Sequence, residues 1–255
     1  MTIRWPDSAA ALEREQARLA GLAPASWRPG DRVAVGACFV CFPRGAGGRG
    51  ARGDPVWAAA VVMRGSRELA RAVVTGAAGA PYEPGLLALR EGPLLEAAVR
   101  ALAPRPEVVL VDATGRDHPR RAGLALHLGA VLDLPTVGVP HRPLLAEGAW
   151  PEDPERGAST PLLLGGEQVG LWLRTRRGAR PLAVHPGWRV DAETARAVVL
   201  ASLRRARTPE PLRRARHEAR LARYRSSTTA SKGSRSARAS QSSADRRSGF
   251  EGRAG

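Results

Sequence analysis

Two acidic residues have the types and positions that a catalytic metal ion needs. Asp112 follows the apolar run Val108–Val111, which is typical of a buried strand that presents a carboxylate at its end. Glu91 lies early in the helix predicted before this strand. If the two converge, their oxygens suit Mg²⁺, which would activate water for phosphodiester hydrolysis. Taken separately, each also fits a simpler role, as a turn cap or as a solvated helical side chain.

Two further features suit contact with a nucleic acid. His118 stands beside Arg120 and Arg121 before a predicted helix, which favours phosphate contact and proton transfer, although a structural histidine fits equally well. Tyr82 lies in a loop between two prolines, whose rings fix φ. A tyrosine held outward in this way can push between bases, as in enzymes that extrude a base, and the alternative is packing on its own domain.

The two cysteines, Cys38 and Cys41, lie three positions apart in one apolar segment. On a strand this spacing places them on opposite faces, so a disulfide is not expected. A Cys-x-x-Cys pair also occurs in zinc sites, but the sequence has no second pair. Residues 1–20 show no signal-peptide pattern. No run of about 18 apolar residues occurs, so we expect a cytoplasmic protein without a membrane span.

The formal net charge is +16, and its distribution favours a polyanionic partner. From Arg204 to the end of the chain, 15 Lys or Arg residues outnumber four acids, so +11 of the charge lies in this last fifth. A base composition of the genome that favours arginine over lysine would explain the sign of the charge but not its clustering. The single lysine, Lys232, lies in this region, which excludes a catalytic lysine within the folded domain.

The elements that must position these residues follow a pattern typical of an α/β fold, with a mixed central sheet flanked by helices. In such sheets the site lies at the carboxyl ends of the strands, where Asp112 stands. We expect one domain over residues 1–225 and a disordered basic Ser/Arg/Gly-rich tail over residues 226–255. The predicted helices are Ser8–Ala20, Leu86–Ala103, Arg120–Leu132, Asp191–Arg207 and Arg213–Arg223, and the predicted strands are Arg32–Phe42, Pro55–Met63, Glu68–Thr75, Glu107–Asp112, Thr136–Val139, Gln168–Arg174 and Pro181–Val184.

The order of the motifs resembles the endonuclease V family. The resemblance covers about Arg32 to Arg207. It implies a ribonuclease H-like fold and Mg²⁺-dependent cleavage of DNA, in some members RNA, at the second phosphodiester bond on the 3′ side of deoxyinosine or inosine. It rests on Pro81-Tyr82-x-Pro84-Gly85-x-Leu87, on Arg90-Glu91, on Val111-Asp112-x-x-Gly115-x-x-His118-Pro119-Arg120-Arg121-x-Gly123, and on Val131-x-x-x-Pro135-Thr136-x-Gly138-Val139.

The resemblance implies a role for each matching residue. Glu91 and Asp112 match two acids of the family's metal site, and His118 matches a histidine near it. Tyr82 and Pro84 match the wedge that separates the strands. The remaining matches are expected to contact the nucleic acid or to line the pocket for the extruded base, and they are Gly85, Leu87, Gly115, Arg120, Arg121, Gly123 and Leu124.

Several positions depart from the family pattern. The first strand ends in Gly-Ala-Cys38 where the family has a metal-binding aspartate, His141 stands in for a lysine, and Trp188 replaces a histidine. A thiol has a pKa of about 8.5 and offers a soft sulfur, so Mg²⁺ selects against it. Glu83 also replaces an aliphatic residue of the wedge, and Ala113 replaces a pocket glycine. These changes favour impaired catalysis.

Three functions therefore remain open. In the first, a working hydrolase holds a weakly bound Mg²⁺ or Mn²⁺ on Glu91 and Asp112, with His141 in place of the lysine. In the second, the protein, as a monomer, binds DNA or RNA that carries a deaminated purine, without a metal and with little cleavage. In the third, Cys38 recruits a softer ion such as Zn²⁺. The lineage favours the first, and the altered residues favour the second.

Overall fold

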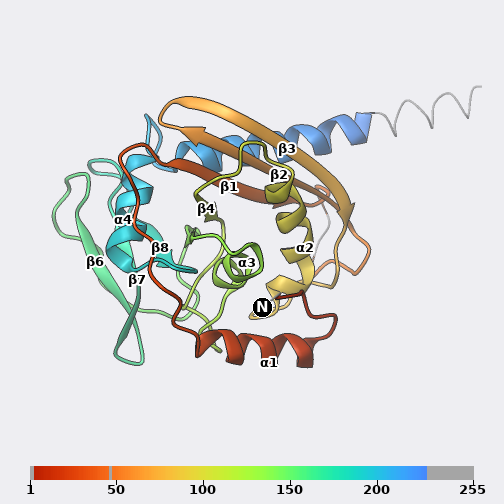
Figure 1. Cartoon of the computed structure of the whole chain (residues 1–255), viewed down its shortest axis with the longest axis horizontal. Helices are drawn as coiled ribbons and strands as arrows, with labels where there is room; N and C mark the ends of the chain where they lie inside the picture. Colours follow the sequence, from red (N-terminus) through yellow and green to blue (C-terminus); the bar gives the residue numbers. More distant parts are fainter. Residues whose placement is uncertain (1–2, 46–47, 229–255) are drawn as a thin grey trace, which may run out of the picture.

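The computed structural model describes residues 3–45 and 48–228. In this part of the chain eight strands form one mixed sheet in the order β3-β2-β1-β4-β5-β8-β7-β6 (Figure 1). Helices lie on both sides of the sheet. This is the mixed central sheet flanked by helices that the sequence predicts.

The first three strands form an antiparallel meander. They are β1 (Ala34–Cys41), β2 (Pro55–Arg64) and β3 (Arg67–Ala77). The tight turn between β2 and β3 contains Gly65 at a φ of +57°, a conformation that glycine adopts at no steric cost. β2 is almost entirely apolar and buried, as expected for a strand covered on both faces. The predicted hairpin is confirmed.

Two short parallel strands extend this meander toward the centre of the sheet. β4 (Val108–Val111) pairs with β1 and with β5 (Thr136–Gly138). The register places Cys38 beside Val111 in the last pair of the two strands, so the residue after Val111 emerges beside the final three residues of β1. The carboxyl ends of these parallel strands therefore share one edge of the sheet.

The other half of the sheet is antiparallel. β8 (Leu182–Pro186) pairs with β5 and with β7 (Glu167–Leu173). β7 in turn pairs with β6 (Ser159–Leu164), a strand that the sequence analysis does not predict. β6 exposes alternate residues at the sheet edge and contains a proline, so its apolar pattern is weak.

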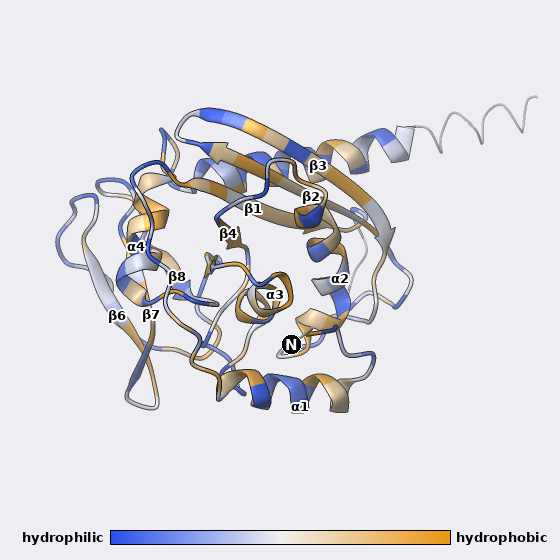
Figure 2. Cartoon of the chain, viewed as in Figure 1, coloured by the Kyte–Doolittle hydropathy of each residue, from blue (hydrophilic) through white to orange (hydrophobic). Residues whose placement is uncertain are grey.

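Alternation along the strands decides which helices each side chain meets. Cys38 faces α1 (Ala9–Ala20), α2 (Leu87–Arg100) and α3 (Leu124–Leu132), while its neighbour Ala37 faces the opposite side. That opposite side is covered by α4 (Ala192–Ala201) and by a helix over residues 210–228, here called the C-terminal helix. Figure 2 shows the apolar residues concentrated in the central strands.

Two helix boundaries differ from the prediction for local reasons. α3 begins at Leu124 instead of Arg120, because Arg121 adopts a left-handed φ of +55° and Gly123 is extended. α4 is capped by Asp191, as predicted, but ends before Ser202 instead of continuing to Arg207. The C-terminal helix includes residues 226–228, which the sequence composition places in the tail, and the rest of the predicted disordered tail lies outside the described residues.

The cysteine prediction is confirmed. Cys38 and Cys41 are both free and buried, and they pack in different clusters. Within the described residues, the helices are too short or too polar to cross a bilayer.

Candidate functional site

The carboxyl edge of β1 and β4 brings three of the predicted site residues together. Cys38 and Val111 form the last pair in the parallel register of β1 and β4, and Asp112 follows Val111 directly. Glu91 comes from the beginning of α2, which packs over this part of the sheet. The three side chains line one cavity of about 190 Å³, here called the acid cavity, together with Tyr82. The family resemblance implies this convergence, which the sequence pattern alone leaves as a condition.

Burial changes the protonation of the acid cavity. Desolvation, and then the negative charge of Asp112, raise the pKa of Glu91 to about 8. Desolvation also raises the pKa of the Cys38 thiol, and the charges of Glu91 and Asp112 add to this effect. At neutral pH Cys38 is therefore a neutral thiol, and Glu91 is largely protonated.

Asp112 already has a cationic partner. Arg216 of the C-terminal helix donates a hydrogen bond from Nη2 to Asp112 Oδ2 at 2.8 Å, and both side chains are more than four-fifths buried. His141, which is exposed, lies next to this pair, with Nε2 at 3.4 Å from Arg216 Nη2. His141, the predicted substitute for the family lysine, therefore lies at the site. Its neighbour there is Arg216, which bonds to Asp112.

These residues do not fit the divalent ion that the resemblance implies. Across the described part of the chain there is no group of three or more His, Cys, Asp and Glu side chains that could hold a metal ion. Mg²⁺ takes hard oxygen ligands in near-octahedral geometry, and the Cys38 thiol supplies none. One of the two oxygens of the remaining carboxylate, Oδ2 of Asp112, accepts a hydrogen bond from Arg216.

A second cavity of about 200 Å³ adjoins the acid cavity and shares Asp112 with it. We call it the loop cavity, because the loop after β3 forms one wall of it. Tyr82 lies at its edge and is 46% exposed. The rest of its lining combines small and apolar residues with several polar or charged ones: Gln16, Glu83, Pro84, Gly85, Leu87, Ala88, Ala113, Thr114, His118, Leu124, Pro140, Arg142, Pro143 and Leu144.

His118 holds the wall of the loop cavity in place. Its Nε2 lies 3.0 Å from the carbonyl oxygen of Gly85, and its Nδ1 accepts a hydrogen bond from the backbone of Arg120. This pattern requires the neutral ring with the proton on Nε2. Desolvation lowers the pKa of His118 to about 4, so the ring stays neutral at physiological pH. Both ring nitrogens are occupied, which fits a positioning role better than proton transfer.

Two of the residues expected to contact nucleic acid have intramolecular partners. Arg120 bonds to Gln16 Oε1 at 2.7 Å and to the carbonyl of Gly85, and so braces the same wall as His118. Arg121 points to the β6–β7 hairpin, where it bonds to the carbonyl of Leu164. Arg121 lines neither cavity.

Gly115 and Gly123 also line neither cavity. A Cβ on Gly115 would clash with the carbonyl oxygen of Pro186, and a Cβ on Gly123 would clash with that of Thr114. The two glycines bond to each other through their backbones at 2.7 Å. They allow close backbone packing behind the loop cavity, and their contact with an extruded base stays a prediction.

Asp117, which is not among the predicted site residues, shapes the roof of the loop cavity. Asp117 is fully buried and accepts hydrogen bonds from the backbone N–H groups of Leu144, Leu145 and Ala146. These bonds fix residues 140–146, which supply four lining residues. An acid inside the Gly115–Arg121 motif is the only sequence signal, because its backbone partners lie far along the chain.

Trp188 does not lie at either cavity. It is buried against Leu126 and Ala130 of α3, and its backbone N–H bonds to Thr136 at the start of β5. The acid cavity lies at the carboxyl end of the parallel strands, so the departure at Trp188 concerns packing at the opposite end and not the acids.

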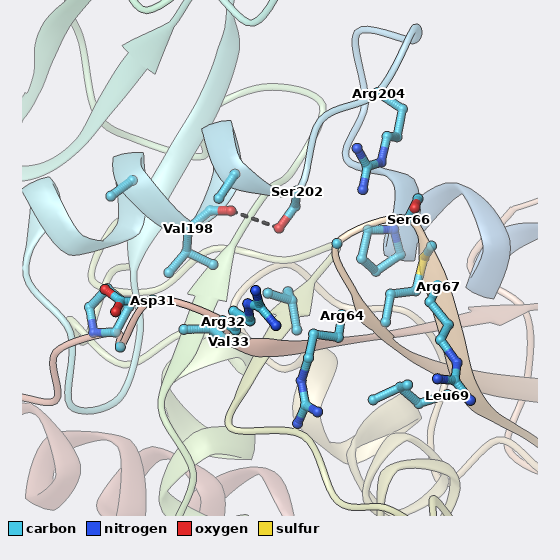
Figure 3. A pocket seen from close by; sticks show the side chains of 18 residues that line it. Asp31, Arg32, Val33, Arg64, Ser66, Arg67, Leu69, Val198, Ser202 and Arg204 are labelled. Carbon is cyan, nitrogen blue, oxygen red and sulfur yellow. Dashed lines mark hydrogen bonds between the residues drawn. The ribbon is translucent and has the colours of Figure 1, made fainter.

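A larger cavity, of about 700 Å³, lies away from these residues. Figure 3 shows it between the start of β1, the β2–β3 turn and the segment after α4. Its lining includes Arg32, Arg64, Arg67 and Arg204, and none of the predicted site residues. Volume alone therefore does not mark the predicted site in this protein.

The sheet order, an antiparallel meander followed by the parallel strands β4 and β5, is that of a ribonuclease H-like fold, and two acids lie at the carboxyl edge of the parallel strands. The family model described as Endonuclease V matches residues 46–217. Endonuclease V from Methanopyrus kandleri is 47% identical over 163 residues, which are 63% of this chain and 69% of that protein. The chain belongs to the endonuclease V family.

Solved structures agree with this assignment. The crystal structure of endonuclease V from Streptomyces avermitilis matches with a TM-score of 0.78 and 36% identity, over 89% of this chain and 100% of that one. Endonuclease V from Ciona intestinalis, solved in complex with a 24mer DNA containing an inosine followed by a ribo-adenosine, matches with a TM-score of 0.69. At 20% identity, over 83% of this chain and 96% of that chain, it shows the fold alone. These matches confirm the predicted family and the ribonuclease H-like fold. They also confirm the assignment to DNA repair endonucleases, a family that depends on a metal.

Proposed function

We propose that this protein acts on DNA, or RNA, that carries a deaminated purine, and that it takes the extruded base into the loop cavity beside Tyr82. The observation that carries the proposal is the cavity itself. It is preformed, it is walled by a proline-rich loop, and that loop is held by His118 and Arg120 through the carbonyl of Gly85. A rigid pocket lowers the entropic cost of binding an extruded base.

The residues of the loop cavity divide the work of recognition. Tyr82 is exposed at the edge of both cavities, where it would fill the space that the extruded base leaves in the stack. Leu87 and Leu124 offer apolar surface to the faces of the base. Backbone groups beside Gly85 and Ala113 would bond to its edge. Gly115 and Gly123 support this arrangement from behind.

Hydrolysis of the phosphodiester bond on the 3′ side of the deaminated base is the reaction that the lineage supports, and Glu91 and Asp112 are the acids that would serve it. A specific observation favours a second candidate, which is binding with little or no cleavage. Cys38 brings no hard oxygen, and Asp112 is paired with Arg216 at 2.8 Å. We propose in either case a monomer acting in the cytoplasm.

One pair of measurements tests both candidates. Binding is measured by fluorescence anisotropy with an oligonucleotide that holds one deoxyinosine and with a matched one that holds deoxyguanosine. Nicking of the same oligonucleotides is measured with Mg²⁺ or Mn²⁺, against a Glu91→Gln, Asp112→Asn control. Preference for deoxyinosine supports the base-recognition proposal, and its absence overturns it. Nicking above the control selects the hydrolase, whereas binding without nicking selects the second candidate.

A further inference from the structure

The C-terminal helix places one arginine, Arg216, against Asp112 of the acid cavity with little freedom, although Arg216 is not itself among the residues that line the cavity. Leu212, Ala215 and Ala219 are fully buried against the sheet, and they fix the rotation of the helix at three- and four-residue spacing. Arg216 follows Ala215 and has a side chain that is only 15% exposed. The register of the helix, and not a chance surface contact, therefore brings Arg216 to Asp112.

The surroundings of Arg216 hold its guanidinium in one position. Nη2 donates to Asp112, and the guanidinium carbon lies 5.4 Å from the centre of the Phe39 ring. Nε is buried and has no hydrogen-bond partner among the described residues. His141 closes the outer side, at 3.4 Å from Nη2. A guanidinium that is packed and stacked in this way is preorganised.

The negative charge of the acid cavity is better balanced by one singly charged cationic side chain than by a divalent ion. Where the resemblance implies a third carboxylate, the chain has Cys38, and a thiol adds no hard ligand. Asp112 lines both cavities, so a nucleic acid whose base enters the loop cavity would bring its backbone near the cation that is bonded to Asp112. A guanidinium has five N–H donors in a planar fork that suits phosphate oxygens.

We propose that the Arg216 guanidinium stands where the family's metal ion would stand, and that it contacts one phosphate of a bound nucleic acid without any metal. The phosphate contact rests on the proposed function, whereas the exclusion of the metal does not. Arg216 is thus the resident cation of this site, held by Asp112, and the protein binds its nucleic acid equally well in the presence of a chelator.

The first experiment measures metal binding without nucleic acid. The full chain is titrated with Mn²⁺, and free Mn²⁺ is followed by electron paramagnetic resonance. The wild type is expected to leave Mn²⁺ free, whereas Cys38→Asp/Arg216→Ala binds it at least about tenfold more tightly, because a first ligand is regained and the competing cation is removed. Tight binding by the wild type, or none by a double variant that circular dichroism shows to be folded, overturns the proposal. If the double variant does not fold, Arg216→Gln alone must bind Mn²⁺ more tightly than the wild type does.

The second experiment measures the phosphate contact. A fluorescein-labelled oligonucleotide with one deoxyinosine is bound in the presence of a chelator, at several salt concentrations. Arg216→Ala is expected to weaken binding about tenfold and to reduce the salt slope by about one, since one phosphate contact is lost. Arg213→Ala, a matched change on the same helix at an arginine that pairs with Glu210, is expected to change affinity less than about threefold.

The outcomes separate this inference from the proposed function. Equal effects of Arg216→Ala and Arg213→Ala, or a wild type that needs Mg²⁺ to bind, overturn the role of Arg216. Failure of the wild type to prefer deoxyinosine overturns the proposed function only. The Mn²⁺ titration still decides in that case whether the arginine has taken the place of the metal ion.

Discussion

The loop cavity and the acid cavity adjoin each other, but the resemblance implies that they depart from the family pattern to different degrees. The loop cavity keeps its two prolines, its glycine turn and His118, with modest changes at Glu83 and Ala113. The acid cavity has two acids, but Cys38 stands where the resemblance implies a third acid, and Arg216 donates a hydrogen bond to Asp112.

The physical reason for the difference lies in what holds each cavity. The loop cavity is shaped by backbone packing and by buried hydrogen bonds from His118 and Asp117, so a change in its frame disturbs the fold. The acid cavity depends on the charges of a few side chains. Cys38 is buried on β1, and because its neutral thiol carries no charge, its burial costs no charge desolvation and the fold tolerates it.

The largest expected effect tests whether packing controls the loop cavity. Gly115→Ala would place a Cβ against the carbonyl of Pro186, and we expect it to lower the free energy of unfolding by about 3 kcal/mol, as overpacking does. Gly30→Ala is the control, because nothing lies within 4 Å of its added Cβ, and it should change stability by less than about 0.5 kcal/mol. Urea unfolding measures both. Equal stability of the two variants would mean that the frame is not tightly packed.

The next effect concerns recognition by the loop cavity. Tyr82→Ala removes the exposed ring, and we expect affinity for a deoxyinosine oligonucleotide to fall about 10- to 100-fold, since stacking of one base contributes about 1–3 kcal/mol. Tyr224→Ala, which removes the only other tyrosine from an exposed position on the C-terminal helix, should have less than about threefold effect. Anisotropy in the presence of a chelator measures both. Similar losses would show that Tyr82 acts as general surface and not as a wedge.

Most of the fold could be predicted because its elements carry local signals. The β2–β3 hairpin has two apolar runs joined by a glycine turn, and Asp191 marks the start of α4. β6 escaped prediction because it lies at an edge and buries few residues. The start of α3 was misplaced because the left-handed conformation of Arg121 depends on tertiary contacts that periodicity does not express.

The candidate site could be predicted only in part. Glu91 and Asp112 follow from a strand that ends in an acid and from a helix before it. Arg216 could not be assigned to Asp112, because the contact joins residues 104 positions apart and depends on how the C-terminal helix rotates. The sequence shows that this helix is basic, but only its buried face, formed by residues such as Ala215, sets which arginine turns inward.

A smaller effect concerns the pH dependence of the loop cavity. The pKa of His118 is lowered from 6.5 to about 4, so the unfolded chain binds a proton that the folded protein does not. Stability is therefore fully present above pH 6.5 and is lost as the pH falls toward 4. Between about pH 7.5 and about pH 5, wild type should lose about 2 kcal/mol more than His118→Gln, because each pKa unit corresponds to about 1.4 kcal/mol. The comparison with the variant is needed because His127 and His185 have lowered pKa values as well, and urea unfolding at the two pH values measures it. An equal loss of stability in both proteins would mean that protonation of His118 does not destabilise the fold at low pH.

The smallest effect is expected when a residue of the acid cavity is substituted and the binding of a base by the loop cavity is measured. Glu91→Gln keeps the shape of the side chain, and since Glu91 is largely protonated at neutral pH, the substitution alters little charge. We expect the affinity for a deoxyinosine oligonucleotide to change less than about threefold, with or without Mg²⁺, because recognition belongs to the other cavity. Glu152→Gln, at an exposed position, is the control for the chemical change. A tenfold loss that appears only with Mg²⁺ present would mean that Glu91 holds an ion, and that the two cavities act as one site.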